Sequence, residues 1–508
     1  MAELILAHDL GTTGNKASLF DRQGCAVASA FAGYGVSYPR PGWAEQDAED
    51  WWRAVAASTG KLLAQEGIAP GDVAAVTFSG QMMGCLLLDG QGKPLRSALI
   101  WADTRATEEA ETLRARIGSE RFYRITGHRA SSSYTAAKYM WLKGHQPEIV
   151  DKARHCLVAK DYLAFRLCGE LASDFSDASG TNLFDLRARR WSDEVLQAAE
   201  LPRELLPPAL PSATVIGGVT PEASKATGLL TGTPVVIGGG DGACATAGAG
   251  VVSPGDAYNY IGSSSWIAFV SQAPLYDPRQ RTFTFAHLDP AYVFPTGTMQ
   301  CAGGSFDWIE RLFRGESEDA IHGRLIEAAG EVAAGCEGLL FLPYLMGERS
   351  PHWNPQARGA FVGLSLSHGR AEMTRAVLEG VMFNLRIILE AFEAQGADIP
   401  LLRLIGGGAR SMVWRQIAAD ILGVPIERPE LLVEATSLGA AAAGGVGVGI
   451  WKDYAEAGRL IALRQGERPI PEHVALYDRL FPLFESLYAE LCPAFERASR
   501  WSAAQREG

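Results

Sequence analysis

Two segments of the chain follow one plan, in which an apolar run, a tight turn of small residues and a second apolar run succeed one another. In the first half, the mostly apolar residues 3–8 lead into Asp-Leu-Gly-Thr-Thr-Gly at 9–14, and a second run follows at 17–20. In the second half, the run 257–261 turns through Gly-Ser-Ser-Ser at 262–265. Short apolar runs joined by Gly-rich turns are typical of β-hairpins. The repetition predicts a duplicated α/β fold, with two lobes and a cleft between them.

The rest of the chain alternates between helical and extended patterns. Apolar periodicity predicts strands at 25–31, 73–78, 233–237 and 266–270 and helices at 49–66, 243–249 and 413–422. A chain of 508 residues is long enough for two or three domains. We place the boundary near residue 245, where the second hairpin set begins, and this divides the chain into domains 1–245 and 246–508.

Charge and cysteine usage limit the environment and the partners. Lys and Arg total 46 against 58 Asp and Glu, a net charge of −12, which disfavours nucleic acid and anionic membranes as partners. The small-residue stretch 435–451 is too polar to span a bilayer, and residues 1–9 lack the basic start of a signal peptide. Eight cysteines without a CxxC pair fit reduced thiols. We therefore expect a cytoplasmic enzyme without nucleic-acid or membrane partners.

The turn at 9–14 is the first candidate site. Gly11, Thr12 and Thr13 would expose backbone N–H groups and two hydroxyls, which suit a polyphosphate. Asp9, at the strand end, could hold Mg²⁺ through water, and Lys16 could add a positive charge near the phosphates. The alternative interpretation is an ordinary hairpin loop.

Two other turns are built from small residues. Residues 262–265 occupy the corresponding place in the second half, and residues 404–411 (Leu-Ile-Gly-Gly-Gly-Ala-Arg-Ser) end a strand before a helix. Glycines in the latter would let a base or ribose lie against the backbone. Each turn alone could be a plain loop or a helix entry. Three such turns in one chain favour a nucleotide site.

One carboxylate stands out beside these turns. Asp241 lies in Gly-Gly-Gly-Asp-Gly at 238–242, at the end of a predicted strand and the start of a small-residue helix. It could simply cap that helix. It could instead accept the proton of a sugar hydroxyl during phosphoryl transfer, which requires one positioned carboxylate. The chain has no GxxxxGK[ST], HExxH or GxSxG motif, and no GxGxxG follows the first strand, which argues against other nucleotide, hydrolase and NAD-dependent chemistries.

Residues 359–380 match the second signature of the FGGY family of carbohydrate kinases throughout. Residues 133–145 match its first signature, with a departure at Gly144. The chain resembles this family over nearly its whole length. The resemblance implies the fold shared by actin, hexokinase and the Hsp70 ATPase, with duplicated ribonuclease H-like domains, and it implies ATP, Mg²⁺ and a small sugar as ligands.

The resemblance also implies roles for individual residues. By it, Asp241 is the general base and Asp9 is associated with phosphate and Mg²⁺. The other nucleotide-binding residues would be Gly11, Thr12, Thr13 and Lys16 in the first turn, Gly262 and Ser263 in the second, and Gly407, Gly408 and Met412 beside the adenosine.

Four segments, at 41–47, 100–105, 160–163 and 341–349, are most similar to the xylulokinase branch, which converts D-xylulose to D-xylulose 5-phosphate. The residues implied at the sugar are Gln81, Met82, Met83 and Trp101, together with Asp241. Met83 stands where that branch has His, and Gly242 where it commonly has Asn. Each change removes a hydrogen-bonding group, so the site would discriminate less strongly for one hydroxyl.

D-xylulose is the first candidate acceptor, and another sugar, a polyol or an aldonate is the alternative. A different class of protein, a non-catalytic ATPase switch on the same fold, would need no sugar pocket. The resemblance further suggests a homodimer. The sequence leaves the phosphorylated hydroxyl open.

Overall fold

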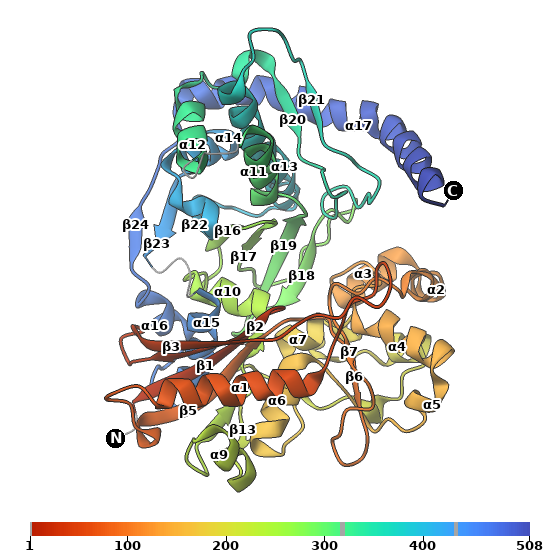
Figure 1. Cartoon of the computed structure of the whole chain (residues 1–508), viewed down its shortest axis with the longest axis vertical. Coiled ribbons are helices and arrows are strands. Elements are labelled where there is room, and N and C mark those ends of the chain that lie inside the picture. Colours follow the sequence, from red (N-terminus) through yellow and green to blue (C-terminus); the bar gives the residue numbers. More distant parts are fainter. Residues whose placement is uncertain (1–2, 315–320, 431–434, 508) are drawn as a thin grey trace.

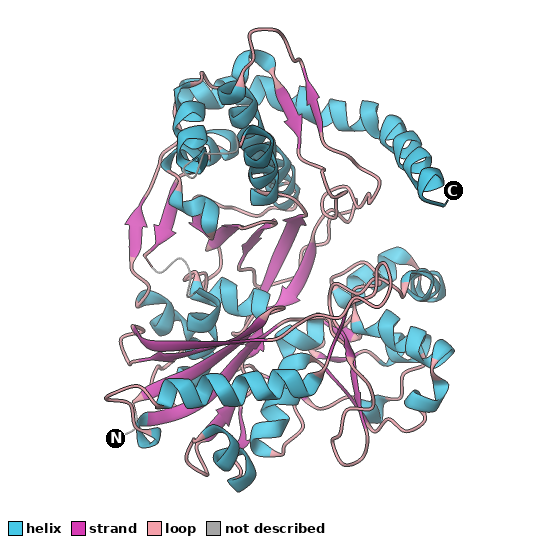
Figure 2. Ribbon diagram, viewed as in Figure 1, coloured by secondary structure: helices cyan, strands magenta, loops and turns pink. Residues whose placement is uncertain are grey.

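Residues 3–314, 321–430 and 435–507 are described by a computed structural model, and they form two lobes (Figure 1). Each lobe is built around a seven-stranded mixed sheet with helices packed against it (Figure 2). The sheet of the N-terminal lobe has the order β13-β14-β5-β1-β2-β3, and β15 also pairs with β5. Its strands are β1 Leu4–Leu10, β2 Gly14–Phe20, β3 Ala26–Gly33, β5 Val73–Gly80, β13 Val215–Gly218, β14 Pro234–Val236 and β15 Gly239–Gly240.

The sheet of the other lobe has the order β18-β19-β17-β16-β22-β23-β24. Its strands are β16 Ala257–Ile261, β17 Ser265–Phe269, β18 Phe283–Ala286, β19 Val293–Met299, β22 Leu402–Ile405, β23 Ile426–Pro429 and β24 Leu463–Gln465. Two-stranded ladders pair β4 Glu45–Gln46 with β7 Ala98–Leu99, β6 Leu86–Leu88 with β8 His155–Leu157, β9 Ser173–Asp174 with β12 Ala209–Leu210, β10 Phe184–Asp185 with β11 Arg190–Trp191, and β20 Leu340–Leu342 with β21 Ala360–Val362.

The helices fall into three groups. Packed on the N-terminal sheet or beside it are α1 Ala48–Leu63, α6 Ala159–Cys168, α9 Pro221–Thr227, α10 Asp241–Gly248, α15 Ala435–Gly447 and α16 Tyr454–Arg459. A second group, on the right of Figure 1, comprises α2 Thr107–Ile117, α3 Ser119–Thr126, α4 Thr135–His145 and α5 Pro147–Val150. α8 Asp193–Ala199 packs on α2 and α4, and α7 Phe175–Ser179 lies between β15 and β18. The upper lobe carries α11 Gly303–Phe313, α12 Ile321–Glu331, α13 Arg370–Glu393, α14 Met412–Leu422 and α17 Pro471–Glu507.

The two predicted hairpins are present. β1 pairs antiparallel with β2, and β16 with β17. One backbone hydrogen bond spans each turn. It runs from the Gly11 N–H to the Gly14 carbonyl (3.0 Å) in the first and from the Gly262 N–H to the Ser264 carbonyl (2.9 Å) in the second. The predicted two-lobed α/β fold is therefore confirmed. The boundary near residue 245 stays a prediction; α15, although late in the sequence, packs on β1 and β5 of the N-terminal sheet.

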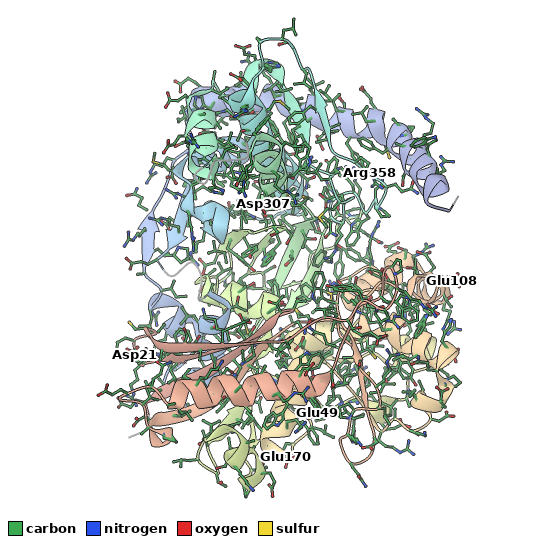
Figure 3. All side chains as sticks on the ribbon, viewed as in Figure 1. Asp21, Glu49, Glu108, Glu170, Asp307 and Arg358 are labelled. Atoms are coloured by element: carbon green, nitrogen blue, oxygen red, sulfur yellow. The ribbon has the colours of Figure 1, made fainter. Side chains whose placement is uncertain are left out.

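Many charged side chains lie on the surface of the protein, and most of its cysteines are buried. Charged side chains such as those of Glu108 and Glu170 are exposed at the periphery (Figure 3). All eight cysteines lie within the described residues and are free thiols, six of them buried. Among the described residues, no helix combines the length and the apolar character needed to cross a bilayer.

α10 and α15 cross at backbone contact, because glycines occupy the crossing. A Cβ atom at Gly439 of α15 would lie 1.8 Å from the Cys244 carbonyl oxygen of α10, and one at Gly248 would lie 1.6 Å from that of Ala435. One continuous apolar cluster joins these helices to both sheets, through Ile5 of β1 and Tyr258 of β16 among others. The helix pair is thus the packed connection between the lobes.

We expect Gly439→Ala to lower the free energy of unfolding by about 1–3 kcal/mol, because the added methyl group forces the two helices apart. Gly60→Ala is the matched control: Gly60 is also helical, and its Cβ would meet nothing within 4 Å. Alanine there should leave stability unchanged or raise it by up to about 1 kcal/mol. Denaturant unfolding of the two variants tests this, and equal stability would contradict the close crossing.

Candidate active site

Three parallel strands bring the candidate acids to one edge of the N-terminal sheet. β1 and β15 both pair parallel with β5, and the register places Asp9 and Gly239 on either side of Ser79. The carboxyl ends of parallel strands meet at the same edge, where ligands bind in open α/β sheets. Asp9, the loop 81–84 that follows β5 and Asp241 after β15 therefore converge.

Asp241 is the first residue of α10. The N-cap position is Gly240, so Asp241 does not cap the helix, and its Oδ1 accepts a hydrogen bond from the Gly242 N–H (2.8 Å). Desolvation by the surrounding protein atoms is the largest effect on Asp241, and the negative charge of Asp9 is the second. Together they raise the pKa of Asp241 to about 7, and the hydrogen bond from the Gly242 N–H opposes this rise. The side chain is nevertheless open to solvent, and water offsets part of the burial effect. A carboxyl group in this state can accept a proton near neutral pH.

Residues outside the first turn donate hydrogen bonds to its backbone carbonyl groups. Its three carbonyl groups accept hydrogen bonds, that of Gly11 from the Tyr34 hydroxyl, that of Thr12 from Gln46 and that of Thr13 from the Tyr34 N–H. These contacts occupy the carbonyl oxygens, which would repel a phosphate, and fix the turn in one conformation. Lys16 lies opposite Asp9 in the β1–β2 register, so the two side chains share one face.

The second and third turns meet at the edge of the other sheet. β16 pairs parallel with β22, and the glycines at 406–408 pack against Ile261, immediately before Gly262. The start of α11 donates N–H groups to the carbonyls of Gly262 and Ser263. Ser263, Gly407 and Met412 are exposed, whereas Gly408 is buried. The structure thus brings together the residues predicted for the second phosphate turn and the adenosine.

α10 connects these two edges through its first turns. The Tyr258 hydroxyl, on β16, receives a hydrogen bond from the Trp266 Nε1–H (2.7 Å) and contacts the Thr246 hydroxyl (3.1 Å) and the Gly242 carbonyl (3.5 Å). Asp241 accordingly lies at the junction of the N-terminal sheet edge with the β16–β17 hairpin.

The four residues predicted at the sugar differ in accessibility. Trp101 is 42% exposed and donates from Nε1 to the Thr12 hydroxyl (3.0 Å), so it adjoins the first turn. Met83 is half-buried and has a left-handed backbone, with φ of 66°. Met82 is buried against Gly240, and Gln81 is buried with its amide turned toward Gln46. Met83 and Trp101 are thus accessible to solvent, whereas Gln81 and Met82 are not.

Sequence reasoning missed Gln46, which joins the loop 81–84 to the first turn. Its Nε2 donates to the Thr12 carbonyl (2.7 Å), and its Oε1 accepts from Gln81 Nε2 (2.7 Å) and Trp51 Nε1 (3.0 Å). Gln46 lies in the segment 41–47 that carried part of the resemblance, but no spacing rule relates it to residues 12 and 81. Only the folded chain reveals this connection.

A cluster of buried charged residues lies close to β15, the strand that directly precedes Asp241. Lys160 Nζ contacts one carboxylate oxygen of each of three aspartates: Asp161 at 2.7 Å, Asp174 at 3.0 Å and Asp177 at 3.3 Å. Ser176 donates its hydroxyl to Asp174 and accepts from the Gly240 N–H (2.9 Å). Burial raises the pKa of Asp177 well above its usual range, against the effect of Lys160 and with a contribution from the charge of Asp241. The cluster therefore anchors the backbone directly before Asp241.

Both halves of the chain match models of one protein family. Residues 4–248 match the N-terminal domain of the FGGY family of carbohydrate kinases, and residues 257–448 match its C-terminal domain. The xylulose kinase of Escherichia coli K12 is 38% identical over 485 residues, covering 96% of this chain and 98% of that one. The gluconokinase of Bacillus subtilis 168 is 31% identical over 495 residues, covering 96% of each. The crystal structure of xylulose kinase from Rhodospirillum rubrum superimposes with a TM-score of 0.90 at 32% identity, covering 97% of this chain and all of that one.

We expect Gln46→Met to destabilise the N-terminal lobe, because it leaves the Thr12 carbonyl and the Gln81 amide without their partner. Each buried polar group left unpaired costs about 1–3 kcal/mol. The control is Gln65→Met, since Gln65 is exposed and its side chain makes a long hydrogen bond, 3.4 Å, to the Ser29 carbonyl. Denaturant unfolding should separate the variants, and equal stabilities would show that Gln46 does not hold these residues.

Proposed function

The chain belongs to the FGGY family of carbohydrate kinases and is a phosphotransferase, and we propose that it transfers the γ-phosphoryl group of ATP to a small ketose. D-xylulose is the proposed acceptor and D-xylulose 5-phosphate the product. The observation that carries the proposal is the position of Asp241, at the first residue of α10 and beside Asp9, where the edges of the two sheets meet. Membership in a family of carbohydrate kinases favours catalysis over the ATPase-switch alternative.

In the proposed reaction Asp241 acts on the acceptor hydroxyl. The hydroxyl oxygen attacks the γ-phosphorus, its proton passes to the carboxylate of Asp241, and the bond from the γ-phosphorus to the bridging oxygen breaks to release ADP. Oδ1 already accepts from the Gly242 N–H, so the remaining oxygen, Oδ2, is the one proposed to take the proton. The rest of catalysis is positioning and neutralisation of charge, as in other phosphoryl transfers.

The donor set fits one Mg²⁺ accompanying ATP. The repulsion between Asp9 and Asp241 contributes to the raised pKa of Asp241, and a divalent cation near Asp9 would offset it. The carboxylate of Asp9 is proposed to hold this ion through water, together with phosphate oxygens, because Mg²⁺ prefers oxygen ligands and keeps much of its hydration shell. Mg²⁺ bound in this way supplies charge neutralisation at the phosphates.

The acceptor is proposed from the relatives. Xylulose kinases support D-xylulose, and the gluconokinase relative favours an aldonate as the second candidate. Met83 and Gly242 both lack the hydrogen-bonding groups of the xylulokinase pattern and lie at the loop and the helix that face the site. A broader acceptor range than that of a strict xylulose kinase follows from this loss. The homodimer and the cytoplasmic location stay predictions.

A coupled assay of ADP release tests the proposed function. D-xylulose, other pentuloses and hexuloses, polyols and D-gluconate are supplied separately with ATP and Mg²⁺, and the product is identified by mass spectrometry and by the position of its phosphate. We expect the highest kcat/KM with D-xylulose. Preference for D-gluconate would replace the proposed acceptor, and turnover with no sugar, polyol or aldonate would contradict the function.

We expect Asp9→Asn to weaken the use of Mg·ATP more than that of the sugar, because the change removes one negative charge from the metal side of the site. The measurement is the Mg²⁺ dependence of turnover, together with KM values for ATP and sugar. Glu108→Gln also removes one acid from the same lobe, at an exposed position, and should behave as wild type. Normal turnover of Asp9→Asn at low Mg²⁺ would refute the assignment.

We expect Asp241→Asn to abolish phosphoryl transfer while leaving ATP binding intact. Asn keeps the size and can still accept from the Gly242 N–H, but it cannot take the proton, and general-base catalysis contributes about 10²- to 10⁴-fold. Turnover and calorimetric ATP binding are the two measurements. Asp193→Asn, also at the first residue of a helix, is the matched control. Turnover above a tenth of wild type would exclude Asp241 as the base.

A further inference from the structure

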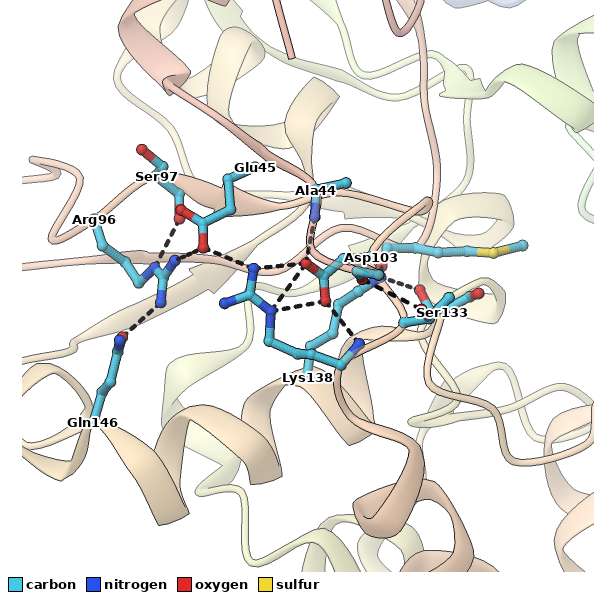
Figure 4. Close-up of polar contacts among 12 residues, drawn as sticks. Ala44, Glu45, Arg96, Ser97, Asp103, Ser133, Lys138 and Gln146 are labelled. Carbon is cyan, nitrogen blue, oxygen red and sulfur yellow. Dashed lines mark hydrogen bonds and ion pairs between the residues drawn. The ribbon is translucent and has the colours of Figure 1, made fainter. Parts of the chain in front are cut away.

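Lys138, on α4, is fully buried and donates to the backbone of two loops (Figure 4). Its side chain is 0% exposed, and Nζ donates to the Met83 carbonyl (3.0 Å) and to the Ser133 carbonyl. Among the described residues, Lys138 forms no ion pair. The adjacent carboxylate of Asp103 is bound by the guanidinium of Arg105, from Nε and Nη2, and by the Ala44 N–H.

A buried amine without a carboxylate partner is costly for the fold. Burial lowers the pKa of Lys138 to about 7, although the charge of Asp103 opposes this. An apolar side chain of the same length would avoid the desolvation penalty but would leave the Met83 and Ser133 carbonyls without this donor. Packing alone therefore does not explain an amine at this position. The two carbonyl groups that it binds, those of Met83 and Ser133, indicate that the amine holds their loops in place.

Both partners belong to segments beside the proposed sugar site. Met83 is the half-buried residue of the loop 81–84, and its φ of 66° lies in the left-handed region that a residue with a side chain rarely adopts. A second donor from the same helix holds the next residue, because the Thr135 hydroxyl donates to the Gly84 carbonyl (2.8 Å). Strained backbone persists only where its surroundings enforce it, and α4 supplies that constraint here.

We propose that Lys138 is a positioning residue for the sugar acceptor: by holding the carbonyls of Met83 and Ser133, it fixes the loop 81–84 in the conformation that presents Met83 to the acceptor. This inference rests on the proposed function and assigns a role to a residue outside the reacting groups. Lys138 does not touch the sugar or the nucleotide and acts through Met83. Its loss should therefore affect the sugar and leave the nucleotide unaffected.

The test compares Lys138→Met with wild type, using D-xylulose and ATP as substrates. Because the variant loses the two hydrogen bonds that hold the loop, we expect KM for D-xylulose to rise about tenfold or more, with KM for ATP within twofold. A purely structural role would lower the melting temperature without this split. Lys143→Met, on the same helix, removes an exposed lysine paired with Glu200 and should leave both KM values within twofold.

A second variant covers the case in which Lys138→Met does not fold. Thr135→Val is nearly isosteric, removes only the hydrogen bond to the Gly84 carbonyl, and should raise KM for D-xylulose about fivefold. Combining Lys138→Met with Met83→Gly should give a smaller loss from the lysine change, because glycine adopts the left-handed backbone without support.

The outcomes separate the two claims. If wild type phosphorylates D-xylulose and Lys138→Met keeps its KM within twofold, the inference is overturned and the proposed function stands. If Lys138→Met does not fold, an unchanged KM in Thr135→Val overturns the inference equally. If wild type phosphorylates no acceptor, the proposed function fails, and the inference that rests on it fails too.

Discussion

The backbone contact between α10 and α15 is the constraint on which the position of the site depends. α15 lies on β1 and β5, and α10 lies on α15 with glycines at the crossing. Because α10 begins at Asp241, the depth at which it sits determines where that carboxylate stands relative to Asp9. A larger side chain at Gly439 would move the helix away from the sheet edge, so packing and site geometry are set by the same contact.

Asp9 and Asp241 bring two like charges to one edge of the N-terminal sheet. Two like charges at neighbouring strand ends repel, and here the repulsion contributes to the raised pKa of Asp241. Conflicts of this kind are expected at functional sites, where a ligand offsets them. The buried cluster of Lys160 differs, since its ion pairs serve the backbone near Gly240 through Ser176. Asp9 and Asp241 lie at the candidate site, whereas the acids of the cluster are paired with Lys160 inside the protein.

The sequence predicted the elements that local rules govern. The hairpins at 9–14 and 262–265, the glycine turn before α14 and the position of Asp241 at the junction of strand and helix follow from spacing and turn chemistry. It could not predict that Gln81 and Met82 are buried, because their accessibility depends on Gln46 and Gly240, which are distant in sequence. The roles of Gln46 and Lys138 were hidden for the same reason: their partners are 34 and 55 residues away.

Gln46 and Lys138 illustrate a common physical solution. A turn that binds phosphate or sugar must direct its own polar groups toward the ligand, so its carbonyls need donors from elsewhere in the fold. Gln46 supplies one to Thr12, and Lys138 supplies one to Met83. Both residues belong to the N-terminal lobe, and because Gln46 also accepts from Gln81, hydrogen bonds connect the first turn to the loop 81–84. The turns at 262–265 and 406–410 belong to the other sheet, and α10 links them to the N-terminal lobe through Tyr258. The residues proposed for the nucleotide and those proposed for the sugar thus belong to different sheets, and α10 packs in one apolar cluster with strands of both.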